Sequence, residues 1–167
     1  SAASDVYKRQ NLLGEHNVQN LTAVLSIIDD LGYKIKKSHI LSFRGTKRRM
    51  NILGKLKKTI FIDDYAHHPT EIEKLINVIS LYKKKNFCLI IEPHRYSRIS
   101  AMIDEFIHCL KKSDQIFILP VFSAGEKKIN NIDSAFFYKK LKKKYIKKKV
   151  YLSEHDKNFF DKLKEKM

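Results

Sequence analysis

The sequence has few cysteines and no apolar run long enough to cross a membrane. Its two cysteines, Cys88 and Cys109, lie inside apolar segments and lack the spacing of metal ligands, so we expect buried thiols in a reducing compartment. The longest apolar runs, 87–91 and 115–122, are far shorter than the roughly 20 residues of a membrane helix. No secretory signal is visible. These absences predict a cytoplasmic protein without a membrane partner.

Several catalytic motifs are also missing. The chain contains no serine or cysteine nucleophile elbow and no Gly-x-x-x-x-Gly-Lys-Ser/Thr phosphate loop. His67 and His68 stand close to Asp63 and Asp64, but adjacent side chains seldom reach one ion, and no pair of histidines four residues apart accompanies them. We therefore expect no transition metal held by this chain.

Acidic residues are in the minority, which raises the question of an anionic partner. The 34 Lys and Arg residues outnumber 18 Asp and Glu residues and give a formal net charge of +16. The lysines are spread over helix faces and ends with few arginines beside them, a pattern more typical of solvated surface. A basic nucleic-acid-binding α/β module remains the alternative, and it requires aromatics among the cations and steep salt dependence. Only Tyr145 fits that requirement, so we expect no nucleic-acid partner.

Apolar runs alternate with amphipathic segments, and a hydrophobic content of 43% indicates a substantial core. The first two predicted strands could form a hairpin, and four strand–helix units follow from the second strand onward. This order predicts a Rossmann-like α/β fold, a mostly parallel sheet with helices on both faces, preceded by a helical segment. Strands are expected at 51–56, 58–62, 87–91, 115–119 and 150–152, and helices at 14–31, 38–43, 71–82, 102–110, 134–141 and 156–164.

Polar residues gather where three of the predicted strands end. The segment 63–71 carries two carboxylates and two imidazoles, the next strand is followed by His94, Arg95 and Arg98, and a third ends near 124–126. Ligands of α/β sheets bind at the carboxyl ends of the strands. Two guanidinium groups three residues apart suit a carboxylate or phosphate, although each could instead pair with a surface glutamate. We predict a cleft for an anionic ligand.

Two asparagines lie in the first turn of the first predicted helix. Asn17 and Asn20 are three residues apart and share a face. A single asparagine there is usually a cap, but two on one face could present carboxamides to a planar ligand such as a purine. Further along, the cationic loop 44–50 is expected to be a hinge between two domains.

The order of these motifs resembles the Mur ligase family, from about Gly14 to about Ser134. The block from Pro93 to Arg98 favours the L-alanine-adding members, whereas the block from His67 to Glu71 would also suit the related muropeptide-recycling ligase. Three residues differ from those most common in the family: Glu92, Phe122 and Lys128. The matching blocks are Gly14-x-His16-Asn17-x-x-Asn20, Phe43-x-Gly45-x-x-Arg48-Arg49, Asp63 to Glu71, Pro93 to Arg98 and Ala124-Gly125-Glu126.

The resemblance implies a fragment of an ATP-dependent amide ligase of peptidoglycan precursor synthesis. Such an enzyme joins L-alanine to UDP-N-acetylmuramate through an acyl phosphate. Residues 11–47 would be the end of a central ATP-binding domain, and residues 48–167 an amino-acid-binding domain cut short at its end. Residues 1–10, which begin with Ser, are expected to be a non-native leader. The phosphate loop and the Mg²⁺ ligands of such an enzyme would lie in the central domain before Gly14, so we expect this chain alone to be inactive.

The resemblance also implies roles for individual residues. Asn17 and Asn20 resemble adenine contacts, Arg49 a γ-phosphate contact, and Asp64 a ribose contact. Arg49, Asp64 and His67 are thus the expected catalytic set. The L-alanine side is expected to consist of Tyr65, His94, Arg95 and Arg98, with His67 nearby.

Overall fold

The structure is a computed structural model that describes residues 15–43, 45–81, 86–154 and 157–166. The chain forms two compact units, Ser1–Tyr65 and Ala66–Met167, which we describe separately. The expected leader 1–10 lies outside the described residues, as do the ends of some expected segments, namely Gly14, Arg44, Tyr82 and Asp156. None of the helices in the described ranges is long and apolar enough to span a bilayer.

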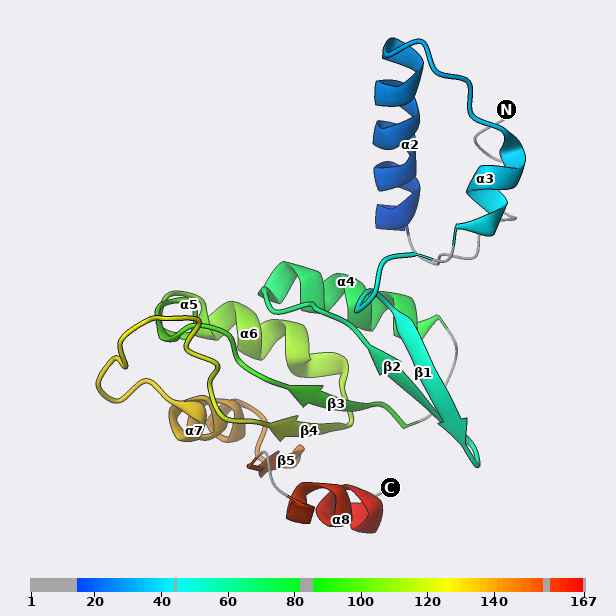
Figure 1. The fold of residues 1–167 in the computed structure, drawn as a ribbon. Helices are drawn as coiled ribbons and strands as arrows, with labels where there is room; N and C mark the ends of the chain where they lie inside the picture. Colours follow the sequence, from blue (N-terminus) through cyan, green and yellow to red (C-terminus); the bar gives the residue numbers. More distant parts are fainter. Residues whose placement is uncertain (1–14, 44, 82–85, 155–156, 167) are drawn as a thin grey trace. The chain divides into compact units, whose positions relative to one another are not determined.

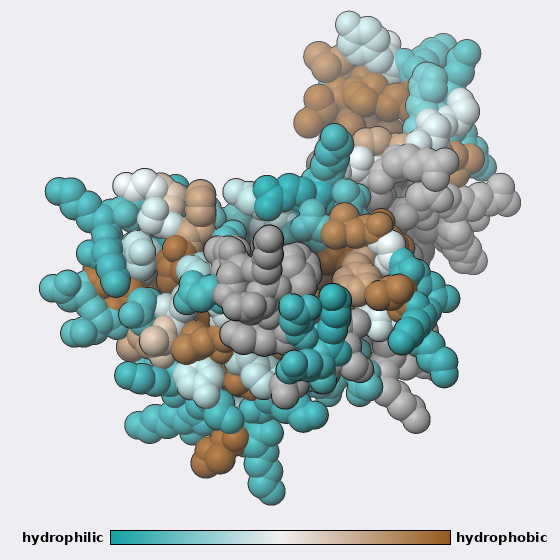
Figure 2. Space-filling model, turned by 60° about the horizontal axis from the view of Figure 1, so that its bottom comes forward, coloured by the Kyte–Doolittle hydropathy of each residue, from teal (hydrophilic) through white to brown (hydrophobic). Residues whose placement is uncertain are grey.

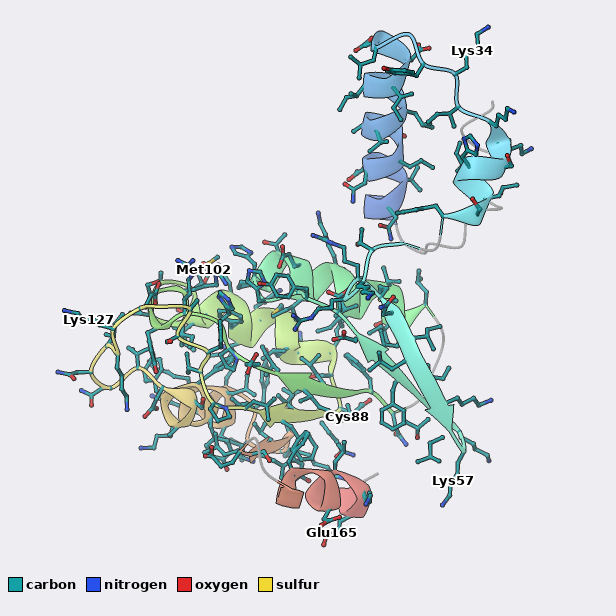
Figure 3. All side chains as sticks on the ribbon, viewed as in Figure 1. Lys34, Lys57, Cys88, Met102, Lys127 and Glu165 are labelled. Atoms are coloured by element: carbon teal, nitrogen blue, oxygen red, sulfur yellow. The ribbon has the colours of Figure 1, made fainter. Side chains whose placement is uncertain are left out.

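The first unit contains two helices and a hairpin (Figure 1). Lys57 lies at the tip of the hairpin, and its φ of +52° lets the chain reverse within two residues (Figure 3). The hairpin strands pair antiparallel, with a shift of register between Ile52 and Gly54. The elements are α2 (Glu15–Asp30), α3 (Lys37–Ser42), β1 (Asn51–Leu56) and β2 (Thr59–Asp63).

Helix α2 keeps much of its apolar surface uncovered within this unit. Val24 and Ile27 are 51% and 58% exposed, and Leu31, directly after the helix, is 65% exposed. Figure 2 shows hydrophobic residues gathered on the part of the molecule that contains α2. The helix ends at Asp30, and Gly32, two residues further on, has a φ of +74°, a conformation that glycine adopts without strain. The sequence thus builds an amphipathic helix whose apolar side exceeds what the unit covers.

The second unit contains a parallel sheet in the order β3-β4-β5 (Figure 1). Its strands are short and apolar, as expected for strands covered by helices on both faces. The elements are α4 (Pro69–Ser80), β3 (Cys88–Ile91), α5 (Tyr96–Ala101), α6 (Ile103–Cys109), the 3₁₀ helix η1 (Leu110–Lys112), β4 (Gln115–Ile118), α7 (Ser134–Lys144), β5 (Lys149–Leu152) and α8 (Lys157–Lys166).

Alternate residues of β4 face opposite sides of this sheet. Ile116 and Ile118 are fully buried in a core cluster with residues of α4, α6 and α7. Phe117 faces the other way, where its ring stacks on Tyr151 at 4.8 Å and meets Phe159 of α8 edge-on at 5.8 Å. Helices therefore cover both faces of the sheet, as the sequence predicted.

The hairpin expected from the first two strands is confirmed, so the second strand does not join the parallel sheet, and the four parallel strand–helix units that the sequence predicted were one too many. Among the described residues, β2 pairs with β1 in the hairpin, and the parallel sheet contains three strands. Local pairing across the two-residue turn at Lys57 closes a very short loop, which costs little chain entropy. The helix expected at 102–110 is found as α6, followed by η1. A further short helix that was not expected, α5, precedes it, and Met102, at φ −127°, separates the two helices (Figure 3).

The two cysteines differ in burial. Cys109 is buried and Cys88 is half-buried, and both are free thiols. Burial raises the pKa of Cys88 to about 11 and that of Cys109 to about 12. Both side chains therefore stay protonated near neutral pH and act as small hydrophobic groups.

We predict that Phe106→Ala lowers the free energy of unfolding by about 3–5 kcal/mol, because the ring is fully buried and its removal leaves a cavity in the core. Urea denaturation of the chain measures this loss. Ile146→Ala is the control: its side chain is 78% exposed, so its effect should stay within about 0.5 kcal/mol. Equal effects of the two substitutions would contradict this description of the core.

Candidate active site

The segments that follow β3 and β4 run side by side beyond the strand ends. His94 and Phe122 form a parallel bridge. The backbone N–H of Arg95 donates to the carbonyl of Phe122 at 2.9 Å, and that of Phe122 donates to the carbonyl of Pro93 at 2.9 Å. Parallel pairing therefore brings the two polar loops to one edge of the sheet.

His94 lies at the centre of a group of rings and cations. Its ring centroid is 4.8 Å from that of His67 and 5.3 Å from that of Phe122. Nη1 of Arg98 lies 3.4 Å from Nδ1 of His94 and 3.5 Å from its carbonyl oxygen. Because a guanidinium can only donate, the contact with Nδ1 needs a neutral imidazole protonated at Nε2.

The surroundings of His94 favour that neutral form. Partial burial lowers the pKa of His94, and electrostatic interaction with His67, Arg98 and Arg95 lowers it further, while Glu92 acts in the opposite direction. At neutral pH the site thus presents a neutral imidazole beside two permanent cations. Such a group can accept a proton, and the guanidinium groups can hold an anion.

His67 is placed by the start of α4. His68 caps the helix, its Nδ1 accepting from the N–H of Thr70 at 3.3 Å, and Pro69 occupies the first helical position. Oε2 of Glu71 accepts from the N–H groups of His67 and His68 at 3.1 and 3.3 Å, which completes a capping box. Oε2 also lies 3.8 Å from Nδ1 of His67.

The two arginines have different partners. Arg98 turns back to His94, whereas Nη1 of Arg95 lies 3.7 Å from Oε1 of Glu126. Glu126 also accepts from the N–H of Ser97 at 3.1 Å and from its hydroxyl at 2.6 Å. These bonds from Ser97, with the Arg95 charge, hold the pKa of Glu126 below its usual value.

The remaining predicted residues belong to the first unit. Oδ2 of Asp64 accepts from the N–H of Met50 at 2.8 Å, and the carbonyl of Arg48 accepts from the N–H of Tyr65 at 2.7 Å. The Arg48 guanidinium lies 5.1 Å from the centroid of the Tyr65 ring. Asp64 and Tyr65 thereby hold the linker around the exposed Arg49 in place.

The other predicted ligand residues of the first unit are on α2. Asn17 is half-buried and Asn20 is exposed, and helical spacing puts them on one face. The structure thus brings together His67, His94, Arg95 and Arg98 in the second unit, and Arg49, Asp64 and Tyr65 in the first. Sequence reasoning pointed to the loop that contains Glu126 but not to its contact with Ser97, since the two residues are 29 positions apart.

Two other observations bear on possible ligands. Within the described part of the chain, no group of three or more His, Cys, Asp or Glu side chains could hold a metal ion. A shallow hollow of about 550 Å³ lies at the amino-terminal ends of β4 and β5, away from His94, and is lined by lysines. Lys148, one of these lysines, donates to the carbonyls of Leu110, Lys111 and Ser113. Its ammonium group therefore stabilises the fold.

Comparison with known proteins identifies relatives of this arrangement. Residues 48–166 match the family model described as Mur ligase, glutamate ligase domain. The UDP-N-acetylmuramate–L-alanine ligase of Carboxydothermus hydrogenoformans is 33% identical over 150 residues, which are 89% of this chain and 32% of that protein. The enzyme of the same name from Campylobacter curvus is 40% identical over 122 residues, 70% of this chain and 28% of that protein.

A solved structure gives the same result for the fold. The UDP-N-acetylmuramate–alanine ligase of Thermotoga maritima superposes with a TM-score of 0.66 at 27% identity, covering 87% of this chain and 30% of that one. The chain therefore spans about a third of the length of the proteins it matches.

We predict that Glu71→Ala lowers the free energy of unfolding by about 1 kcal/mol at pH 6, because two N–H groups lose their acceptor. Hydrogen bonds from the backbone of His67 and His68 outweigh partial burial and hold the pKa of Glu71 below its usual value. A carboxylate whose pKa is lower in the folded than in the unfolded state stabilises the fold at pH values above its unfolded-state pKa. This stabilisation is lost as the pH falls through the folded-state pKa.

The difference between wild type and Glu71→Ala should therefore shrink between pH 6 and pH 3 in urea titrations. Glu73→Ala, on the exposed side of the same helix, is the control and should change stability by less than about 0.5 kcal/mol. A Glu71→Ala loss that is constant with pH would show that the charged carboxylate is not the group that stabilises α4.

Proposed function

The chain belongs to the Mur ligase family, and on that premise we propose that it forms the carboxyl-terminal part of an ATP-dependent ligase that joins L-alanine to UDP-N-acetylmuramate. The observation that carries the proposal is the cluster of His67, His94, Arg95 and Arg98 at one edge of the sheet. Both curated relatives described above bear the name of the L-alanine-adding enzyme, which favours it over the muropeptide-recycling ligase.

The proposed reaction has two steps. The γ-phosphoryl group of ATP is first transferred to the carboxylate of UDP-N-acetylmuramate, which gives an acyl phosphate and ADP. The amine of L-alanine then attacks the acyl carbon, an amide C–N bond forms, and inorganic phosphate leaves. The amine must be unprotonated to attack, so L-alanine, bound as its ammonium form, has to lose a proton in the site.

The second unit contains groups suited to the L-alanine side. The guanidinium groups of Arg95 and Arg98 suit its carboxylate, since charge-assisted hydrogen bonds to a planar anion are strong. His67 is the proposed proton acceptor, with the Glu71 carboxylate 3.8 Å from its Nδ1 to orient the ring. His94 is the neutral neighbour that supports the His67 ring.

The first unit contains groups suited to the nucleotide side. We assign Arg49 to the transferred phosphoryl group, where a fixed cation stabilises charge that develops during transfer. Asp64 would accept from the ribose, and Asn17 and Asn20 would contact adenine. Mg²⁺, which supplies further charge stabilisation in phosphoryl transfer, would be held by residues upstream of those described. The hinge at 44–50 would let the domains close for catalysis.

The proposed domain division also has physical support. We assign residues 11–47 to the end of an ATP-binding domain and residues 48–167 to the amino-acid-binding domain. Val24 and Ile27 of α2, and Leu31 directly after it, are exposed apolar side chains, as expected for a helix whose covering elements lie elsewhere. The family match begins at residue 48, at the proposed boundary.

We expect the isolated 167-residue chain to release no ADP from ATP, because it lacks a phosphate loop. The complete ligase, meaning this chain joined to the upstream ATP-binding region that the proposal requires, should release ADP only when UDP-N-acetylmuramate is present, and form an amide only with L-alanine. A coupled ADP assay and mass spectrometry of the product test this. L-Alanine-dependent ADP release by the isolated chain, or a complete ligase indifferent to L-alanine, would refute the proposal.

In the complete ligase, Arg49→Ala should lower kcat by roughly 10²–10³-fold, because a fixed charge on the transferred phosphoryl group is lost. Asp64→Ala should raise KM for ATP about tenfold through loss of a charge-assisted hydrogen bond. Steady-state kinetics with varied ATP separate the two effects. Lys47→Ala removes an exposed cation from the same loop and is the control. Wild-type kinetics for both Arg49→Ala and Asp64→Ala would mean that neither residue serves the nucleotide.

A further inference from the structure

Arg95 has a backbone conformation that its side chain disfavours. Its φ of +70° and ψ of 131° lie in a region that glycine occupies readily and other residues rarely. The conformation is fixed by the hydrogen bond from Arg95 N–H to the Phe122 carbonyl at 2.9 Å. Strain of this kind persists only where the surrounding structure determines it, and it concentrates at functional sites.

Helix α5, which begins directly after Arg95, has no cap of its own. The side chain of Arg95, at the capping position, makes no hydrogen bond to the first turn. Instead, Glu126 of a distant loop caps the helix. One of its carboxylate oxygens accepts from Ser97 N–H at 3.1 Å and the other from the Ser97 hydroxyl at 2.6 Å. The orientation of the first turn of α5 therefore depends on a carboxylate 29 residues away.

A tight turn aims Glu126 at this position. The N–H of Glu126 donates to the carbonyl of Ser123 at 3.1 Å, and the two central residues, Ala124 and Gly125, have φ values of +50° and +84°. Glu126 is also the sole acidic residue in the sequence from 123 to 131, and Lys127 points outward from this loop (Figure 3). A basic surface loop thus turns its carboxylate inward to Ser97.

Glu126 orients the guanidinium of Arg95 but leaves its hydrogen-bond donors available. The 3.7 Å between Nη1 and Oε1 exceeds a good hydrogen bond, and both carboxylate oxygens already accept from Ser97. The side chain is 48% exposed. Its N–H groups therefore remain able to bind an external anion, while the nearby carboxylate limits the directions in which the long side chain can point.

We propose that Glu126, clamped by Ser97, is a positioning residue that sets Arg95 to receive the carboxylate of the incoming amino acid. Glu126 itself touches no substrate and acts through Ser97 and Arg95. This inference rests on the proposed function, because it takes the ligand of Arg95 to be an amino-acid carboxylate. Glu126 should therefore affect the reaction only when the amino-acid substrate carries a free carboxylate.

A kinetic cycle in the complete ligase tests the inference. L-Alanine and L-alaninamide, which has the amine but no carboxylate, are compared as acceptors in wild type and in Glu126→Ala. With L-alanine, Glu126→Ala should raise KM about tenfold to a hundredfold, with KM for ATP unchanged. With L-alaninamide, which wild type should use poorly, the substitution should change kcat/KM by less than about twofold.

Two further variants make the cycle specific. Glu126→Gln keeps one oxygen acceptor for Ser97 and should recover part of the L-alanine KM. Glu105→Gln removes an exposed carboxylate from α6 and should leave both substrates unaffected. A Glu126→Ala loss that is equal for L-alanine and L-alaninamide would show a general structural role and overturn the proposal, as would the absence of any loss.

A second measurement does not depend on ligase activity. Amide hydrogen exchange of Ser97, measured by NMR on the 167-residue chain, should become about tenfold faster in Glu126→Ala, because its acceptor is removed. An unchanged rate of Ser97 amide exchange in Glu126→Ala would overturn the proposed hydrogen bonding of Ser97 to Glu126, whatever the kinetics show. A wild-type ligase that does not use L-alanine, together with faster Ser97 exchange in the variant, would refute the proposed function and its amino-acid ligand while leaving the contact itself established.

Discussion

Two hydrogen bonds beyond the ends of β3 and β4 hold the candidate site together. They run from Arg95 N–H to the carbonyl of Phe122 and from Phe122 N–H to the carbonyl of Pro93, each at 2.9 Å. They extend the parallel pairing of the strands into the loops, so His94, Arg95 and the start of α5, which carries Arg98, meet the turn that carries Glu126. Without this pairing the loops would move independently, and the guanidinium groups would lose their fixed geometry.

The chemistry of the site follows from how its charges are arranged. Burial and neighbouring cations keep His94 neutral, and its Nδ1 faces Arg98. Glu71 and Glu126 do not simply neutralise the cations, since each accepts hydrogen bonds from backbone N–H groups and fixes the start of a helix. The two acids therefore serve positioning, and the cations remain available for an anion. This division of roles supports the proposed binding of an amino-acid carboxylate.

Much of the second unit could be predicted from the sequence, because short apolar runs followed by polar residues mark parallel strands and their carboxyl ends. The hairpin of β1 and β2 was also predicted, although the apolar run of β2 was counted as the start of the first parallel strand–helix unit. The positive φ of Arg95 has no local signal, because the residue is not glycine, and the short helix α5 that follows it was not expected. The contact between Glu126 and Ser97 depends on tertiary structure, and one sequence does not say which acid pairs with which loop.

A crystal structure of the complete ligase with L-alanine, UDP-N-acetylmuramate and a non-hydrolysable ATP analogue tests the central claim most directly. The account predicts that the L-alanine carboxylate lies within hydrogen-bonding distance of the Arg95 or Arg98 guanidinium, that its amine faces His67, and that Glu126 still accepts from Ser97. L-Alanine bound away from the loops that follow β3 and β4, with both guanidinium groups turned to solvent, would contradict it.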